Sequence, residues 1–169
     1  MSILDLGPSV IAGHPVGQCV RVSRTLKARP DVVFDAWVNP DKLQRWWAGE
    51  NRLVEIHALD VRIGGEWRIA FATPDANHYE MGGVYQEVSR PEKLSFSWTV
   101  TANGRRSETS LVVIDFAAEG EGTMLTVAHH LHDGSKAIDS VGAGWKRSLG
   151  TLVRVVDGSG SLWKCEVRS

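Results

Sequence analysis

Hydrophobic and polar positions follow a strand-like pattern through most of the chain and a helical pattern near its end. Alternation over short segments bounded by turn residues is typical of antiparallel strands, whereas apolar residues three or four apart indicate a helix. The predicted strands cover residues 18–27, 54–61, 67–71, 78–88, 94–100, 109–116 and 123–131. Apolar residues at 145, 149, 152, 153 and 156 predict a long helix over about residues 136–156.

Two short helices are predicted between the first and second strands. Pro30 suits the first turn of a helix whose apolar residues include Trp37. Asn39 precedes a proline, and a residue in that position is disfavoured in the helical region, so the first helix ends there. A second helix then runs from Pro40 to about Trp46.

This order of elements predicts an α+β helix-grip fold. A long amphipathic helix that follows a series of strands must place its apolar face against the sheet, because neither apolar surface is stable in water. We therefore expect a curved antiparallel sheet of about six or seven strands wrapped around a long C-terminal helix, with two short helices after the first strand. The expected organisation is an N-terminal arm (1–16), a single domain (17–157) and a C-terminal tail (158–169) whose Gly-Ser-Gly-Ser stretch is typical of a spacer.

The alternation along the strands also predicts which side chains face the long helix. Several large apolar and aromatic residues fall on that face, which indicates a cavity between the sheet and the helix. The residues expected to line it are Trp67, Ile69, Phe71, Tyr85, Phe96, Trp98, Val127, His129, Trp145 and Leu149.

His129 is the polar residue on this predicted inward face, while His130 and His132 are predicted to point to solvent. A neutral imidazole in an apolar cavity is able to orient a polar ligand group or to act as a general acid or base. The alternative is a core histidine that is hydrogen-bonded to a neighbouring group. Burial lowers the pKa of His129 under either interpretation.

Composition and charge narrow the classes of function. Seven tryptophans, against two tyrosines and four phenylalanines, are typical of a large core or of a pocket for flat ligands. Nineteen basic and twenty acidic residues give a formal net charge of −1, so no basic footprint for nucleic acid is present.

Metal, cofactor and membrane signals are weak in the sequence. Cys19 and Cys165 have no metal-binding or redox spacing, and His130 and His132 lack a third ligand at a recognisable spacing, so we expect neither a metal nor a cofactor. Residues 1–17 lack the basic start of a signal peptide, and no apolar run approaches the roughly 20 residues that span a bilayer. These features predict a cytoplasmic protein without a membrane span.

An ordered set of short motifs runs through residues 18–157. The motifs are Phe34-x-x-Trp37, Asn39-Pro40-x-x-Leu43-x-x-Trp46-Trp47, Gly64-Gly65-x-Trp67, Gly83-x-Tyr85-x-Glu87-Val88, Pro91-x-x-Leu94-x-Phe96-x-Trp98, Gly122-Thr123-x-Leu125-Thr126 and Gly144-Trp145 followed by Leu149 and Leu152. Together they resemble the domain that shares its name with the activator of Hsp90 ATPase, within the START/Bet v 1-like (SRPBCC) superfamily.

The resemblance implies a cavity between sheet and long helix that is often used for hydrophobic small molecules. It also implies that Gly144 lets the helix approach the sheet while Trp145 fills the space beneath. It carries over no catalytic triad, because the family shares none, and the fold hosts binders, co-chaperones and enzymes.

Three functions are consistent with the sequence. The first is binding of a small hydrophobic or aromatic molecule in the cavity. The second is a cavity enzyme of the cyclase, dehydratase or hydrolase type that uses His129 as acid or base. The third is a protein-interaction module, either co-chaperone-like or homodimeric.

Overall fold

The computed structural model describes residues 17–49, 52–132 and 134–158. The expected N-terminal arm, residues 159–169 of the expected tail, and Cys165 lie outside the described residues. Within the described part, no helix is long and apolar enough to cross a membrane.

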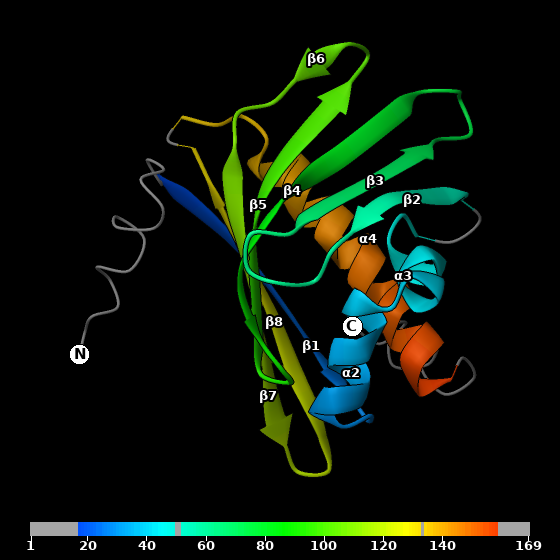
Figure 1. The fold of residues 1–169 in the computed structure, drawn as a ribbon, viewed down its shortest axis with the longest axis vertical. Helices are drawn as coiled ribbons and strands as arrows, with labels where there is room; N and C mark the ends of the chain where they lie inside the picture. The colour runs from blue at the N-terminus through cyan, green and yellow to red at the C-terminus, as the bar shows by residue number, and fades with distance from the viewer. Residues whose placement is uncertain (1–16, 50–51, 133, 159–169) are drawn as a thin grey trace.

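A single curved antiparallel sheet forms most of the protein (Figure 1). Its strands are β1 (Gln18–Leu26), β2 (Val54–Leu59), β3 (Glu66–Ala72), β4 (His78–Ser89), β5 (Lys93–Ala102), β6 (Arg105–Arg106), β7 (Ser110–Glu119) and β8 (Gly122–Leu131). The strand order is β1-β8-β7-β5-β4-β3-β2, and the two-residue β6 pairs with β5. The predicted fold class is thus confirmed.

Strand β6 is an addition to the predicted set, and it belongs to a tight hairpin. Asn103 and Gly104 both have positive φ, 52° and 78°, and Ala102 pairs with Arg105 across the turn. An Asn-Gly pair adopts this conformation readily, so the chain reverses within two residues and continues the pairing briefly. The predicted turn at Asn103-Gly104 is confirmed, and the short strand results from it.

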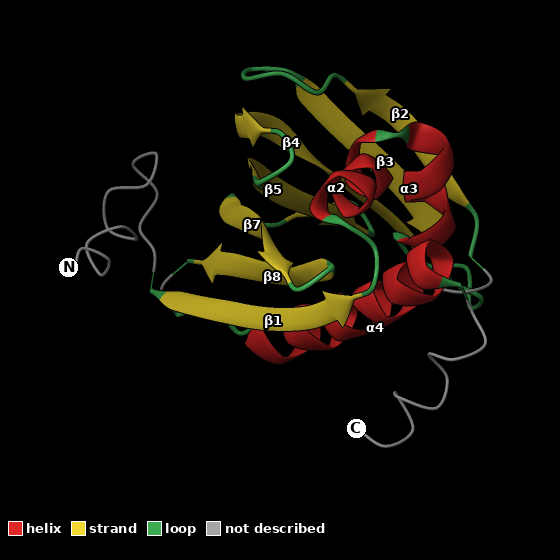
Figure 2. Cartoon of the chain, turned by 90° about the horizontal axis from the view of Figure 1, so that it is seen from below, coloured by secondary structure: helices red, strands yellow, loops and turns green. Residues whose placement is uncertain are grey.

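The helices of the described residues lie on the concave side of the sheet, as Figure 2 shows. They are α2 (Pro30–Val38), α3 (Pro40–Trp46) and α4 (Ile138–Asp157). The Asn39 side chain accepts a hydrogen bond of 2.9 Å from the Asp41 amide, which caps the start of α3. The long helix was predicted from about residue 136, and it begins at Ile138, two residues later.

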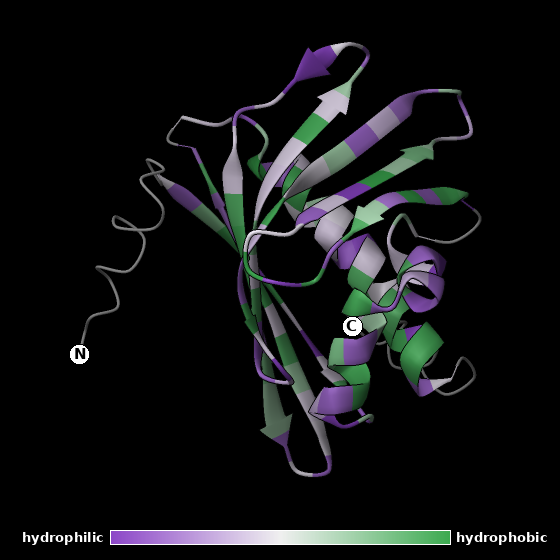
Figure 3. Ribbon diagram, in the orientation of Figure 1, coloured by the Kyte–Doolittle hydropathy of each residue, from purple (hydrophilic) through white to green (hydrophobic). Residues whose placement is uncertain are grey.

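Helix α4 crosses the sheet and packs closely along β1 (Figure 2). Trp145, Leu149, Leu152 and Val153 form its buried face, with the three-to-four spacing that the sequence predicted. In Figure 3 the hydrophobic and hydrophilic positions alternate along the strands and along the helices. This alternation places one apolar face of the sheet against the helix layer.

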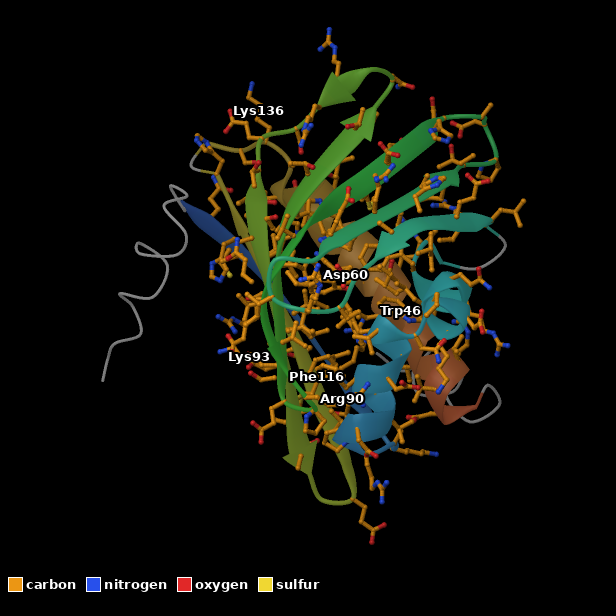
Figure 4. The ribbon with its side chains drawn as sticks, in the orientation of Figure 1. Trp46, Asp60, Arg90, Lys93, Phe116 and Lys136 are labelled. Atoms are coloured by element: carbon orange, nitrogen blue, oxygen red, sulfur yellow. The ribbon has the colours of Figure 1, made fainter. Side chains whose placement is uncertain are left out.

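Helices α2 and α3 close one end of the interior with aromatic side chains. The Trp37 ring centroid lies 4.6 Å from that of Trp46 and 6.2 Å from that of Phe116. The Trp46 indole N–H donates a 3.0 Å hydrogen bond to the Ala36 carbonyl, so its polar group is satisfied although the residue is fully buried. Figure 4 places Arg90 and Phe116 beside α2, where the Arg90 guanidinium lies 4.7 Å from the Phe34 ring centroid.

Candidate functional site

The interior next to α2 and α3 is filled by side chains. Only a void of about 10 Å³ remains there, at or below the size that accommodates one water molecule. The surrounding residues are Trp37, Leu43, Trp47, Leu59, Trp67, Ile69, Tyr85, Leu94 and Phe96. Four of the residues expected to line a cavity (Trp67, Ile69, Tyr85 and Phe96) therefore belong to packed core in this structure.

A pocket of about 440 Å³ opens between strands β3–β5 and the N-terminal half of α4. We refer to it as the main pocket. Its lining consists of Trp47, Ala48, Arg52, Phe71, Thr73, Tyr79, Met81, Trp98, Val100, Ser140, Val141, Gly144, Trp145, Arg147 and Ser148. Its volume lies within the range of about 300–1,000 Å³ that is usual for small-molecule sites.

Aromatic rings from the sheet form two walls of the main pocket. Phe71 on β3 pairs directly with Tyr79 on β4, and their rings stack with centroids 5.3 Å apart. Trp98 on β5 contacts Trp145 on α4 at 5.4 Å and Trp47 at 5.6 Å. Phe71, Tyr79 and Trp98 are only half-buried, so apolar surface in these walls is left uncovered by the protein.

Gly144 contributes to the open space on the helix side of the main pocket. A Cβ atom built at Gly144 has no heavy atom within 4 Å outside its own helix and chain neighbours. The expectation that Gly144 lets the helix approach the sheet is therefore wrong, because a close approach leaves such a Cβ atom in contact. Instead, the glycine leaves room between the helix and the facing strands.

His129 faces inward, as predicted, and is fully buried. The Trp145 indole N–H donates a 3.0 Å hydrogen bond to Nδ1 of His129. An indole N–H can only donate, so Nδ1 carries no proton and Nε2 does. Nε2–H then donates to Ser110 Oγ at 2.7 Å, and the Ser110 hydroxyl donates to the Trp98 carbonyl at 3.4 Å. This chain of hydrogen bonds connects α4 to β8, β7 and β5.

The same hydrogen bonds restrict the chemistry of His129. Burial lowers the pKa of His129 to about 3, so the imidazole is neutral at pH 7. Its basic nitrogen accepts from Trp145, and its other nitrogen donates to Ser110, so the ring is not placed to remove the Ser110 proton. The arrangement supports the interpretation of His129 as a hydrogen-bonded core histidine.

A second pocket, of about 400 Å³, lies on the other side of Trp98. It is lined by Trp98, Val100, Ser107, Glu108, Ser110, His129, Leu131, His132, Gly134, Ser135, Ala137 and Val141. His132 Nε2 lies 3.1 Å from a Glu108 carboxylate oxygen, and both side chains are largely exposed. Trp98, Val100 and Val141 line both pockets, so they form the partition between them.

The remaining histidines that the structure describes are not grouped around a common metal position. His130 lies on the opposite face of β8 from His129, as predicted, but it is half-buried, and its pKa is lowered first by that burial and then by the Arg21 charge. In the part of the chain that the structure describes, no cluster of three or more His, Cys, Asp or Glu residues is placed to hold a metal ion.

The ten residues expected to bind a ligand lie in different parts of the interior. Phe71, Trp98 and Trp145 line the main pocket, and Trp98 and His129 line the second pocket. Val127 and Leu149 are fully buried core residues that line neither.

Sequence reasoning missed much of the helix side and the rim of the main pocket. Val141, Gly144 and Ser148 lie on one helical face, three and four residues apart, but a glycine and a serine weaken the apolar signal of that face. Arg52 and Arg147 at the pocket have no motif that distinguishes them from other surface arginines.

The chain is similar to a known protein family and to several solved structures. Residues 27–157 match the family described as "Activator of Hsp90 ATPase homolog 1-like protein". A protein from Chromobacterium violaceum is 22% identical, with a TM-score of 0.73 over 83% of this chain and 99% of that one. A protein from Silicibacter pomeroyi named for the same family is 22% identical, with a TM-score of 0.70 over 90% of this chain and 100% of that one.

A third similar structure is DynU16, a protein of the dynemicin biosynthetic locus. It is 21% identical, with a TM-score of 0.65 over 85% of this chain and 49% of that one. No curated protein matches the chain. At these identities, the three solved structures establish a shared fold and nothing about activity.

Proposed function

The chain belongs to the Activator of Hsp90 ATPase homolog 1-like family, and we propose that it binds an apolar or aromatic small molecule in the main pocket. The observation that carries the proposal is the combination of open volume with uncovered aromatic walls. A pocket of about 440 Å³ is bordered by half-buried Phe71, Tyr79 and Trp98. Exposed apolar surface inside a concave site favours a ligand that removes it from water.

The energetics of such binding depend on the apolar area that the ligand covers. Each 100 Å² of apolar surface removed from water contributes roughly 2.5 kcal/mol. Loss of ligand freedom opposes this gain, so measurable affinity requires that a ligand contact several walls at once. The rings of Phe71 and Tyr79 on one side and of Trp98 and Trp145 on another offer flat surfaces for a planar ligand.

The two alternative functions stay predictions. The neutral, doubly hydrogen-bonded state of His129 gives no support to an acid or base role at pH 7. The large exposed hydrophobic residues, such as Leu53 and Ile63, do not indicate which protein an interaction module would bind. A homodimer and a cytoplasmic location likewise stay predictions from the sequence.

The proposal is tested by filling the main pocket from the helix side. Leucine replaces glycine in the variant Gly144→Leu, where the added side chain enters open space and the helix propensity improves. Ala143→Leu is the matched control, because Ala143 is the neighbouring helical residue and is exposed. Binding of the neutral fluorescent probe N-phenyl-naphthylamine is measured by titration for the wild-type protein and both variants.

We expect the probe to bind the wild-type protein and Ala143→Leu equally, and Gly144→Leu at least about 10-fold more weakly, the equivalent of about 1.4 kcal/mol. Circular dichroism and thermal unfolding check that both variants are folded. Equal binding to all three proteins contradicts the proposal, because the probe then occupies another surface. Failure of the wild-type protein to bind the probe also counts against it.

A further inference from the structure

We infer that the natural ligand of the main pocket is an organic acid, whose apolar body lies against the aromatic walls and whose carboxylate binds Arg147 and Arg52. This inference rests on the proposed function, since it specifies the chemical class of the ligand. The charges around the pocket and the hydrogen bonds of its serine and threonine hydroxyl groups carry it.

The charged residues in the described lining of the main pocket are all basic. Arg52 and Arg147 line it, and none of its described lining residues is an aspartate or a glutamate. The whole chain has a formal net charge of −1, so the local positive charge does not follow from a basic protein. Two guanidinium groups at an apolar pocket favour a ligand that combines apolar surface with negative charge.

Arg147 is held at the pocket by the chain beyond α3. A Cβ atom placed on Gly49 lies only 3.1 Å from Cδ and 3.3 Å from Cγ of Arg147, so the arginine stem passes directly over this glycine. Among the described residues, no carboxylate oxygen comes within 4.0 Å of the Arg147 guanidinium, whereas Arg62 and Arg68 each form an ion pair. The charge of Arg147 is therefore available to a ligand.

Arg52 lines the pocket just before β2 and is half-buried. The nearby carboxylate is Asp75, whose pKa is lowered first by a hydrogen bond from the Thr73 hydroxyl and least by the charge of Arg52. Asp75 does not line the pocket and forms no ion pair with Arg52 within 4.0 Å. Among the described residues, none accepts a hydrogen bond from the Arg52 guanidinium, so its donors face no competing acceptor in that part of the chain.

The serine and threonine hydroxyl groups of the described lining already donate their protons within the protein, and Tyr79 carries the one other hydroxyl among the described lining residues. The Ser148 hydroxyl donates to the Trp47 carbonyl at 2.6 Å, and the Ser140 hydroxyl donates to the Ala137 carbonyl at 3.0 Å. The Thr73 hydroxyl donates to Asp75. A carboxylate only accepts hydrogen bonds, the arginines are the charged donors of the described lining, and their planar forks match its two oxygens.

The test compares an acid with its neutral isostere. Naphthylacetic acid and naphthylacetamide have the same ring and nearly the same size, and each competes with bound N-phenyl-naphthylamine at neutral pH. The proteins are the wild type, Arg147→Met, Arg52→Met and the control Arg45→Met, which removes a charge from an exposed position on α3 outside the pocket.

We expect the acid to bind the wild type about 10-fold more tightly than the amide, the effect of one charge-assisted contact. Arg147→Met is expected to remove most of that preference, Arg52→Met part of it, and Arg45→Met none, while amide affinity changes little in every variant. Raising the salt concentration should weaken binding of the acid alone, because screening acts on the charged contact.

Equal affinity for acid and amide in the wild type overturns this inference and leaves the proposed function intact, since the probe and both compounds still bind. A preference for the acid that survives both arginine replacements also overturns it, because another group is then responsible. If the wild-type protein does not bind the probe, the result contradicts the proposed function itself, and the inference with it.

Discussion

The two ends of the interior between sheet and helices contain the same kinds of side chain but are packed differently. Beside α2 and α3, tryptophan and phenylalanine rings contact one another and leave a void of about 10 Å³. Beside the N-terminal half of α4, similar rings line a pocket of about 440 Å³. The facing layer differs. It presents the indoles of α2 and α3 at the filled end, whereas at the open end Ser140, Gly144 and Ser148 of α4 accompany Trp145.

This comparison shows that aromatic residues on the sheet do not by themselves determine a cavity. Trp67 and Trp98 lie on the same face of neighbouring parts of the sheet, with ring centroids 5.5 Å apart. Trp67 is 2% exposed and belongs to the core, whereas Trp98 is half-buried and borders both pockets. Whether a ring fills space or lines it depends on the volume of the residues opposite.

The largest expected effect is a loss of stability on truncation in the filled end. Trp46→Ala removes a fully buried indole and its hydrogen bond to the Ala36 carbonyl. We expect the free energy of unfolding to fall by about 3–5 kcal/mol, because the surrounding rings leave a cavity in place of the indole. Urea denaturation of the wild type and the variant measures this change.

Phe71→Ala is the matched control in the open end. Phe71 is half-buried and stacks on Tyr79, so its removal is expected to cost about 1 kcal/mol of stability or less. The same replacement is expected to weaken binding of N-phenyl-naphthylamine, because it removes a wall of the pocket. Equal losses of stability in the two variants would contradict the distinction between the two ends.

The next effect concerns His129, which is fully buried and lines the second pocket. Burial lowers its pKa from 6.5 to about 3. The unfolded chain therefore binds a proton at this residue between about pH 6.5 and 3, and the folded protein does not. The contribution of His129 to the free energy of unfolding is therefore fully present above pH 6.5. It decreases as the pH falls through that window, by up to about 1.4 kcal/mol per pH unit.

His129→Gln separates this effect from the titration of other groups. At neutral pH we expect it to cost about 1–3 kcal/mol, because the Trp145 indole N–H and the Ser110 hydroxyl lose well-placed partners. Between pH 7 and pH 5 the variant should lose roughly 2 kcal/mol less stability than the wild type. Denaturation at both pH values measures this, and His130→Gln is the control, because half-buried His130 carries less of the burial effect. If the stability of His129→Gln changed with pH as much as that of the wild type, the result would contradict the lowered pKa of His129.

The smallest effect is a gain of stability at Gly144. Because a Cβ atom there meets nothing within 4 Å, Gly144→Ala is expected to raise the free energy of unfolding by about 0.5–1 kcal/mol through the better helix propensity of alanine. Gly83→Ala is the contrasting control, since its Cβ atom lies 1.9 Å from the Ser97 carbonyl oxygen. Destabilisation by Gly144→Ala in thermal unfolding would contradict the open space around this glycine.

Local patterns predicted the elements and their inward faces well. The alternation at Trp67, Ile69 and Phe71 and at Phe96 and Trp98 assigned these residues to the helix-facing side, and the structure places them there. Asn103-Gly104 predicted its own turn, because positive φ at both positions is a property of these residue types. The inward orientation of His129 followed from the same alternation.

The site itself was harder to predict, because it depends on residues without a periodic apolar signal. Ser148 and Gly144 reach the main pocket from α4, and Arg52 reaches it from the start of β2. Tyr79 reaches it because β4 pairs in register with β3 and places Tyr79 beside Phe71. These neighbours come from separate parts of the chain, so only the paired and packed structure identifies them.

The sequence by itself determined the series of strands, the two short helices and the long C-terminal helix, because turn residues and hydrophobic periodicity act over a few neighbouring positions. It also determined the side of the sheet that faces the helices. The tertiary structure alone decided which end of the interior is filled and which is open, and which tautomer His129 adopts. These properties depend on side-chain volumes and donors that meet across long sequence separations, where each residue's environment is set by its partners rather than by its neighbours in the chain.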